Sequence, residues 1–279
     1  IDADLNVLPS RDSVMKRIEQ AGLTSNQAGY LWMDDSLGLI LNKLDELKLA
    51  HNTIVLFVAD HGSGHKGSLY KAKGTEVPCI MRWPAGMKAG VRSEELIQNT
   101  DFVPTWFELA GVKKPAAYRM DGVSLAPLFQ APHEPVREYV YGEIGAARSI
   151  KTKTHSYIAL RYTREQVAGV QERQRRELKA LTGLSGGVSR SIATHPHAYT
   201  CDQLYDLNRD PDAQKNLADQ KRHAGTLTQM KQKLAAELKR FPARPYGEFV
   251  PGGNALAGGG YDKVFEILRQ AAVDKKPKK

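Results

Sequence analysis

Four polar side chains lie within seven residues of one another, directly after an apolar segment: Asp60, His61, His65 and Lys66. A carboxylate and an imidazole are common ligands of divalent cations in proteins. A lysine ammonium group is a compact positive charge that attracts anions. This combination of an acid, two imidazoles and a lysine predicts anion or metal chemistry.

The segment before these side chains, residues 53–59, is a continuous run of apolar and β-branched residues. The run is too short to span a membrane, and it indicates a strand buried on both faces, as in the middle of a parallel sheet. Open α/β sheets bind ligands at the carboxyl ends of such strands. Apolar residues at helical spacing over 25–49 precede this strand, and a second strand is expected over 77–83. We therefore expect an α/β fold with part of a mainly parallel sheet flanked by helices.

The residues at the end of the strand are also compatible with an ordinary turn. In that case Asp60 caps backbone amides and Gly62 supplies a positive φ. The three residues alone do not decide between a turn and a binding site, so the longer string that contains them matters.

Four short strings follow one another in that longer segment: Asp60-His61-Gly62, Lys66-Gly67-Ser68-Leu69-Tyr70, Val77-Pro78 and Arg82-Trp83-Pro84-Ala85-Gly86. In this order and spacing they resemble the C-terminal half of a sulfatase, a family of the alkaline-phosphatase superfamily. The resemblance covers roughly residues 25–240. It is specific because several separate strings match in order.

The resemblance implies a sulfuric ester hydrolase of the arylsulfatase type. By this resemblance Asp60 and His61 are the metal ligands, and Lys66 is the catalytic lysine that binds the sulfate. His65 is adjacent and is a weaker catalytic candidate. The implied cation is Ca²⁺, with Mg²⁺ or Mn²⁺ as alternatives, and the implied substrate is a sulfated small molecule or a sulfated glycan. The family resemblance also implies a periplasmic or secreted protein, although no signal peptide is visible in the sequence.

The sequence departs from the family in two places. Sulfatases form their formylglycine nucleophile from Cys-x-Pro-Ser-Arg, and this motif is absent from the sequence. Residues 7–11, Val-Leu-Pro-Ser-Arg, resemble it by coincidence, because a valine cannot be oxidised to an aldehyde and the family has its nucleophile much further upstream of the Asp-His-Gly string. We therefore expect the formylglycine on a missing N-terminal half of the catalytic domain, and expect this chain by itself to be incomplete as an enzyme. The loop over 70–76 also differs from the family string, so it stays open whether Lys71 or Lys73 points into the site.

The chain is expected to contain three parts. Residues 1–136 correspond to the C-terminal half of the sulfatase α/β domain, and 137–245 to a C-terminal subdomain with a basic insertion at 163–202. Residues 246–279 are glycine-rich and basic, which predicts a flexible tail.

Several elements of these parts are predicted from local patterns. Ser10 or Asp12 caps a helix that ends near Gln20. Asp101 precedes another helix, and its expected role is to bind backbone amides rather than to do chemistry. The remaining expected elements are a strand at 94–98, a helix at 102–110, antiparallel strands at 138–143, 147–152, 156–161 and 203–207, and a helix at 226–240.

Three other groups of residues are candidate sites. Asp34 and Asp35 form a carboxylate pair, but their position within a helix favours a solvated face. The basic helix expected over 164–181 is either a cationic flap over an anionic substrate or a solvated helix, and we favour the second. His195 and His197 have no cysteine beside them, so a zinc site there is not favoured.

The composition sets broad limits. The 279 residues are 41% hydrophobic, with a formal net charge of +9 and no run that approaches a membrane span. The two cysteines, Cys79 and Cys201, imply no disulfide framework. Cys79 lies in an expected strand, which predicts a buried thiol.

Two alternatives to a sulfatase remain open. One is a phosphodiesterase or phosphonate hydrolase of the same superfamily, which would share the metal pair. The other is a non-catalytic module that binds anions such as sulfated glycans through its basic segments. We do not expect a nucleic acid partner. Anion binding that weakens steeply with salt but is unaffected by a chelator would support the second alternative.

Overall fold

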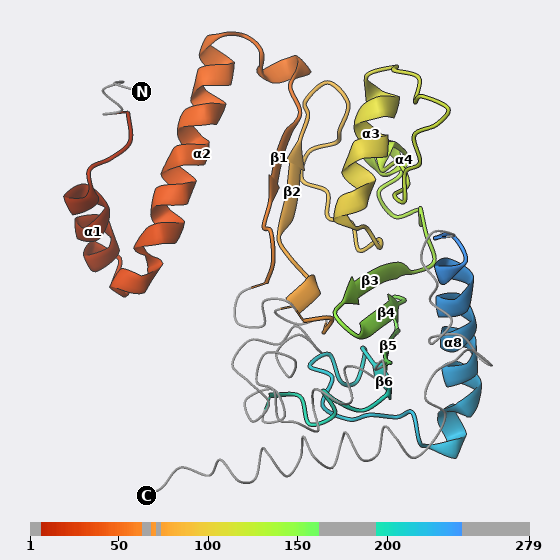
Figure 1. Ribbon diagram of the computed structural model, residues 1–279. Coiled ribbons are helices and arrows are strands. Elements are labelled where there is room, and N and C mark those ends of the chain that lie inside the picture. The colour runs from red at the N-terminus through yellow and green to blue at the C-terminus, as the bar shows by residue number, and fades with distance from the viewer. Residues whose placement is uncertain (1–6, 63–67, 71–73, 162–193, 242–279) are drawn as a thin grey trace, which may run out of the picture. The chain divides into compact units, whose positions relative to one another are not determined.

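The computed structural model describes residues 7–62, 68–70, 74–161 and 194–241 (Figure 1). It divides into two compact units, which are described separately. The first comprises Ile1–Phe57 and Ile80–Val91, and the second comprises Val58–Cys79 and Arg92–Lys279. The basic insertion helix and the C-terminal tail expected from the sequence lie outside the described residues.

The first unit begins with two helices. Helix α1, Arg11–Gln20, starts as predicted with Ser10, whose hydroxyl accepts the amide of Ser13 at 3.2 Å. Helix α2, Ala28–Glu46, follows the short 3-10 turn Ser25–Gln27 and ends near Leu47. Asp35 on α2 binds the guanidinium of Arg17 on α1 at 2.7 and 3.0 Å. Asp35 therefore joins two helices and is largely covered, whereas a solvated position was expected for it.

Strands β1, Val55–Val58, and β2, Cys79–Arg82, form a two-stranded sheet. Both strands were predicted, but the expected burial is wrong. Val58 is 39% exposed and Ile80 is 65% exposed, and Cys79 is exposed rather than buried. In the described part of the chain each of these strands has a single strand neighbour, so their side chains are only partly covered. A mixed α/β fold is confirmed, whereas the mainly parallel sheet is not.

The second unit contains helices α3, Phe102–Leu109, and α4, Ala126–Gln130, around a buried carboxylate. Asp101 is fully buried and accepts the backbone amides of Gln98 at 2.8 Å and Val123 at 3.0 Å, as predicted. It also binds the guanidinium of Arg137. This network fixes the segments on both sides of α3.

The predicted strand at 94–98 is wrong. No strand forms here because the polar groups of the segment bind side chains or isolated backbone groups and not the backbone of a neighbouring strand. The Gln98 amide nitrogen binds Asp101, and its side-chain oxygen accepts the amide of Tyr141 at 3.2 Å. Glu95 binds Lys153 at 2.7 Å.

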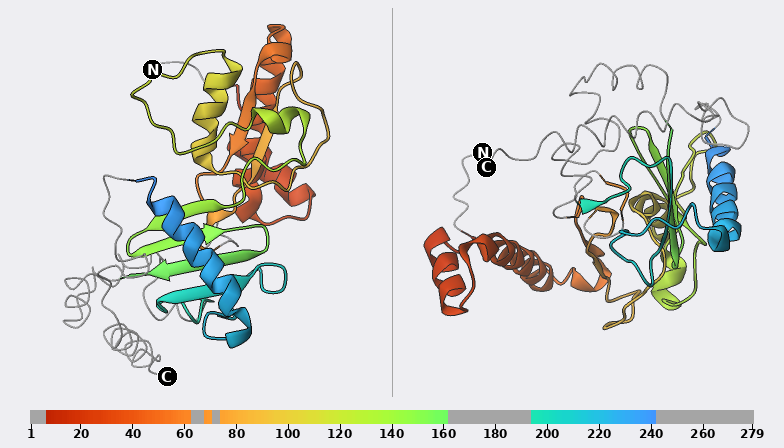
Figure 2. Two further views of the ribbon diagram at one scale, coloured as in Figure 1. Left: turned by 90° about the vertical axis from the view of Figure 1, so that its right-hand side faces the viewer. Right: turned by 90° about the horizontal axis from the view of Figure 1, so that it is seen from below.

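A four-stranded antiparallel sheet forms the largest element of the second unit. Its strands lie in the order β3, β4, β5 and β6, and span Val140–Ile144, Ala147–Lys151, His155–Leu160 and Asp202–Asp206. Helix α8, Ala224–Leu238, crosses one face of this sheet (Figure 2). All four strands and this helix were predicted to within a few residues. Short 3-10 turns are Ala50–Asn52, Asn99–Asp101 and Lys221–His223.

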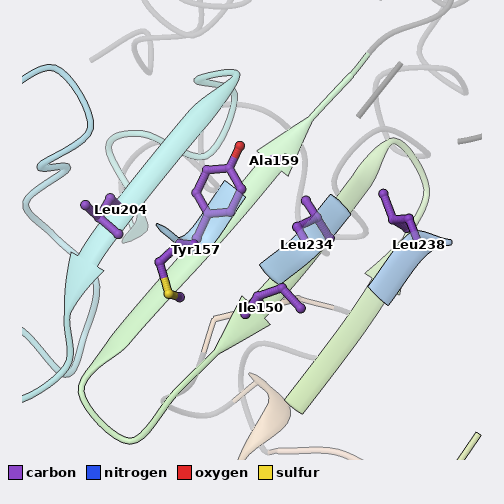
Figure 3. Packing of buried hydrophobic residues seen from close by; sticks show 7 residues of the cluster. Ile150, Tyr157, Ala159, Leu204, Leu234 and Leu238 are labelled. Atoms are coloured by element: carbon purple, nitrogen blue, oxygen red, sulfur yellow. The ribbon is translucent and has the colours of Figure 1, made fainter. Parts of the chain in front are cut away.

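The hydrophobic core lies between the sheet and α8. Ile150, Tyr157 and Leu204 are paired across neighbouring strands and point to this side, where Leu234 and Leu238 of the helix meet them (Figure 3). Strand residues alternate between faces, so their neighbours in sequence must point to the opposite side. Those neighbours are buried too, although many are polar.

Candidate active site

The backbone after β1 is held against the backbone before β2. The amide of Ala59 donates to the carbonyl of Pro78 at 3.2 Å, and the amide of Gly62 donates to the carbonyl of Gly74 at 3.2 Å. Asp60 and His61 therefore lie on a turn whose two ends are tied to the same return segment.

Asp60 and His61 direct their side chains toward each other at this turn. Atom Nε2 of His61 lies 3.4 Å from Oδ2 of Asp60. Atom Nδ1 of His61 lies 3.0 Å from the carbonyl oxygen of Gly62 and, in the neutral ring, donates its proton there. A ring that carries its proton on Nδ1 presents an unprotonated Nε2. The lone pair of Nε2 therefore faces the same space as the carboxylate oxygen.

This pair fits a divalent cation. Two ligand atoms in adjacent coordination positions lie about 3 Å apart when each is bound at roughly 2.0–2.5 Å. The second hydrogen bond of a metal-binding histidine commonly runs to a backbone carbonyl, as it does here. The side chain of Asp60 is 85% exposed, so its carboxylate is accessible to an ion.

The pair alone is not a complete metal site. No group of three or more histidine, cysteine, aspartate or glutamate side chains that could hold a metal occurs among the described residues. Asp60 also accepts the amide of His61 on Oδ1 at 2.9 Å, so the turn interpretation of this aspartate holds in part. Further ligands must come from elsewhere if a cation binds.

The other two candidates, His65 and Lys66, lie outside the described residues, as do Lys71 and Lys73. The next described residues along the chain are buried. Ser68, Leu69 and Tyr70 are 5%, 7% and 5% exposed. A methyl group added at Gly142 of β3 would lie 3.1 Å from the Leu69 side chain, so Leu69 packs directly on the sheet.

Sequence reasoning missed the residues that hold this segment. Tyr70 donates its hydroxyl to the side-chain oxygen of Gln203 on β6 at 2.8 Å. The ring of Tyr70 stacks on that of His195, with centroids 3.7 Å apart. Lys151 of β4 donates to the hydroxyl of Thr75. The sequence signal that could have revealed these contacts is the alternation of polar residues with the core residues in β4 and β6.

These contacts lie on the face of the sheet opposite α8. Ser149 pairs with Ile158, which pairs with Gln203, and Lys151 pairs with Ser156, which pairs with Tyr205. These six residues are all at least 94% buried. The segment 68–75 therefore packs against a polar but buried sheet face.

Comparison with known proteins gives a consistent result. The Sulfatase family model matches residues 11–112. An ulvan-active sulfatase of Formosa agariphila is 35% identical over 186 residues, which is 63% of this chain and 35% of that protein. An N-acetylglucosamine-6-O-sulfatase of Bacteroides thetaiotaomicron is 31% identical over 137 residues, covering 44% of this chain and 24% of that protein. The chain thus spans about a third or less of the length of these curated relatives.

A solved structure also shares the fold. It is a complex with the substrate D-glucosamine-2-N,6-O-disulfate, and it matches 78% of this chain and 40% of its own with a TM-score of 0.58 at 21% identity. No helix among the described residues has the length and apolar character needed to cross a membrane.

Proposed function

We propose that this chain is a member of the sulfatase family and supplies the metal-binding and sulfate-binding part of a sulfuric ester hydrolase active site. The observation that carries this proposal is the approach of His61 Nε2 to Asp60 Oδ2, with Nδ1 of the same ring held by the Gly62 carbonyl. The pair sits in the family string that the resemblance assigns to the metal.

The proposed roles follow from the charge on a sulfate ester. Asp60 and His61 would hold a divalent cation, with Ca²⁺ favoured and Mg²⁺ or Mn²⁺ as alternatives. The bound cation would stabilise the negative charge on the sulfuryl oxygens. Lys66 would bind the same oxygens as a second positive charge, and His65 would lie beside it.

The nucleophile is proposed to lie outside this sequence. The proline position of a Cys-x-Pro-Ser-Arg motif is occupied by Met81 after Cys79 and by Gln203 after Cys201, so neither cysteine lies in a formylglycine site. The formylglycine is therefore assigned to an upstream, N-terminal part of the catalytic domain. Exposed apolar side chains on α2, β1 and β2 support this partner, because such side chains favour burial against another surface. They include Tyr30, Met33 and Ile40 of α2, Val58 of β1 and Ile80 of β2.

The proposed substrates are sulfated glycans or sulfated small molecules. The two relatives described above are an ulvan-active sulfatase and an N-acetylglucosamine-6-O-sulfatase, and their names point to sulfated saccharides. A protein that acts on such polymers would work in the periplasm or outside the cell, and we propose that location here.

A complementation assay tests the proposal. Residues 1–279 are assayed on a chromogenic aryl sulfate with Ca²⁺, alone and with the upstream half of the domain supplied in trans. Turnover is expected only when both parts are present, and it should be lost in Asp60→Ala. Turnover by the chain alone above the Asp60→Ala control would show that some unidentified residue is the nucleophile. Preference for an aryl phosphonate or a phosphodiester would instead assign another reaction of the superfamily.

A further inference from the structure

Gln203 lies at the centre of a buried polar cluster beneath the candidate site. Its side-chain oxygen accepts two hydroxyl protons, from Tyr70 at 2.8 Å and from Tyr205 at 2.9 Å. Its side-chain nitrogen donates to the carbonyl of Thr200 at 3.0 Å, which fixes the orientation of the amide. Gln203 and Tyr205 are fully buried.

The two tyrosines are constant donors to this amide. Burial raises the pKa of the Tyr70 hydroxyl and of the Tyr205 hydroxyl. Both therefore stay protonated at neutral pH. Tyr205 belongs to β6 itself, whereas Tyr70 belongs to the loop between β1 and β2. Of the two hydroxyl bonds to Gln203, the one from Tyr70 therefore ties the loop to the sheet, and the one from Tyr205 lies within β6.

A continuous series of hydrogen bonds runs from Tyr70 to the imidazole of His61. The carbonyl of Tyr70 accepts the amide of Thr75 at 3.0 Å and its hydroxyl at 3.2 Å. The carbonyl of the preceding residue, Gly74, accepts the amide of Gly62 at 3.2 Å. The carbonyl of Gly62 in turn lies 3.0 Å from Nδ1 of His61.

Packing supports the same series. A methyl group added at Gly74 would lie 2.4 Å from the hydroxyl oxygen of Ser68, so the turn at Gly74 fits closely against the segment 68–70 that contains Tyr70. His195 covers the other side of this segment by stacking on the Tyr70 ring at an interplanar angle of 11°. Tyr70 therefore has one defined position, set by the C-terminal sheet.

We propose that Gln203 is a positioning residue for His61. By holding Tyr70, it fixes the turn at Gly74, which holds Gly62, whose carbonyl sets the ring orientation of His61. The C-terminal sheet thus orients a metal ligand more than 140 residues away in the sequence. This inference rests on the proposed function for the role of His61 as a ligand, but the hydrogen-bonded series stands on geometry alone.

The chain offers a matched pair of variants for the test. Tyr70→Phe and Tyr205→Phe each remove one buried hydroxyl that donates to the same oxygen of Gln203. The two variants should lower the melting temperature by similar amounts. Tyr70→Phe removes the hydroxyl bond from the loop to Gln203, whereas Tyr205→Phe keeps that bond and the edge contact between the two rings. A merely structural role and a positioning role therefore give different results.

The experiment measures Ca²⁺ affinity and hydrogen exchange in the full-length protein. In Tyr70→Phe, Ca²⁺ binding should weaken by about 10- to 100-fold, the range seen when a metal ligand loses its outer support. Amide exchange of Gly62 and Thr75 should also become faster. Tyr205→Phe should change both quantities much less, because the bond from Tyr70 to Gln203 remains. Adding Gln203→Met to Tyr70→Phe should weaken Ca²⁺ binding little further, because of the three side-chain hydrogen bonds of Gln203 only the one from Tyr70 reaches the loop.

Two results would overturn the proposal. One is equal loss of Ca²⁺ affinity in Tyr70→Phe and Tyr205→Phe, and the other is unchanged exchange at Gly62 and Thr75 in Tyr70→Phe. A wild-type protein that binds no divalent cation would instead contradict the proposed function. The exchange measurement needs no cation, so it still decides whether Tyr70 and Gln203 hold the turn.

Discussion

Arg161 and Asp202 form an ion pair of 2.7 Å at the point where β5 ends and β6 begins. The same guanidinium donates to the carbonyls of Leu160 at 2.8 Å and Cys201 at 2.7 Å. The amide of Leu160 also donates to the carbonyl of Cys201 at 2.8 Å. These contacts therefore hold the end of β5 against the start of β6, the two points in the sequence between which the basic insertion lies.

The first prediction concerns that insertion. Replacing residues 165–190 by a short Gly-Ser linker should leave the melting temperature unchanged, because the contacts described above, made by Arg161, Cys201 and Asp202, lie outside the replaced residues. Arg161→Met is the control, and it should lower the melting temperature. Unfolding of the deletion variant would contradict this prediction.

The same deletion separates the two interpretations of the basic segment. A solvated helix, which we favour, predicts unchanged binding to a sulfated polysaccharide. A cationic flap predicts weaker binding and a smaller dependence of the affinity on salt concentration. Binding isotherms at two salt concentrations distinguish these outcomes.

The second prediction concerns acid stability. Burial alone would raise the pKa of Asp202, but the charge of Arg161, with hydrogen bonds from Lys231 and Tyr157, lowers the pKa from 3.8 to about 2. Because the folded pKa lies below the unfolded one, the stabilisation is present above pH 3.8 and is lost as the pH falls towards 2. Its size is about 2 kcal/mol.

Acid titrations of the free energy of unfolding check this. Asp202→Asn should be less stable at neutral pH and should lose less stability than the wild type between pH 3.8 and pH 2. Asp212→Asn, at an exposed position, is the control and should follow the wild type. Parallel curves for wild type and Asp202→Asn in this window would refute the assignment.

The local elements could be predicted because their signals are local. Ser10 marks the start of α1, and the 3.6-residue apolar spacing identifies α8 against the sheet. The alternation in β4 and β5 is equally visible in the sequence. The turn at Asp60 and His61 was recognisable because a family string and an apolar strand meet there.

The contacts that hold the site could not be predicted because they are distant in sequence and polar. Tyr70 and Gln203 are 133 residues apart, and nothing in either segment specifies the other. Polar residues on a strand normally indicate a solvated face, whereas Ser149 and Gln203 are buried under the loop. The strand predicted at 94–98 was wrong for a related reason. The hydrogen bonds of this segment run to side chains, and no periodicity in the sequence reveals them.

The third prediction concerns the buried ion pair of Asp101 and Arg137. Asp101→Ala leaves the guanidinium of Arg137 buried without this carboxylate and removes two acceptors of backbone amides. The free energy of unfolding should fall by about 3–5 kcal/mol. Glu94→Ala removes an exposed ion pair with Arg92 and should cost about 0–1 kcal/mol. Denaturant unfolding of both variants compares them, and equal losses would show that the Asp101 network is not a structural centre.

The fourth prediction concerns Lys66, whose role is proposed from its place in the family string. Lys66→Ala in the complete enzyme should lower turnover about 10- to 1000-fold, because one positive charge on the sulfuryl oxygens is lost. The melting temperature should not change. If Lys71→Ala or Lys73→Ala is the damaging substitution instead, another lysine of this loop binds the sulfate.

The central claim is that Asp60 and His61 hold a divalent cation. Isothermal titration of the full-length protein with Ca²⁺, and then with Mg²⁺ and Mn²⁺, measures this directly for wild type, Asp60→Ala and the control Asp34→Ala. Asp34 is an exposed carboxylate on α2, so its removal should leave the affinity unchanged. Asp60→Ala should abolish or strongly weaken binding, because it removes a charged ligand beside Nε2 of His61. Equal affinity in wild type and Asp60→Ala would contradict the account.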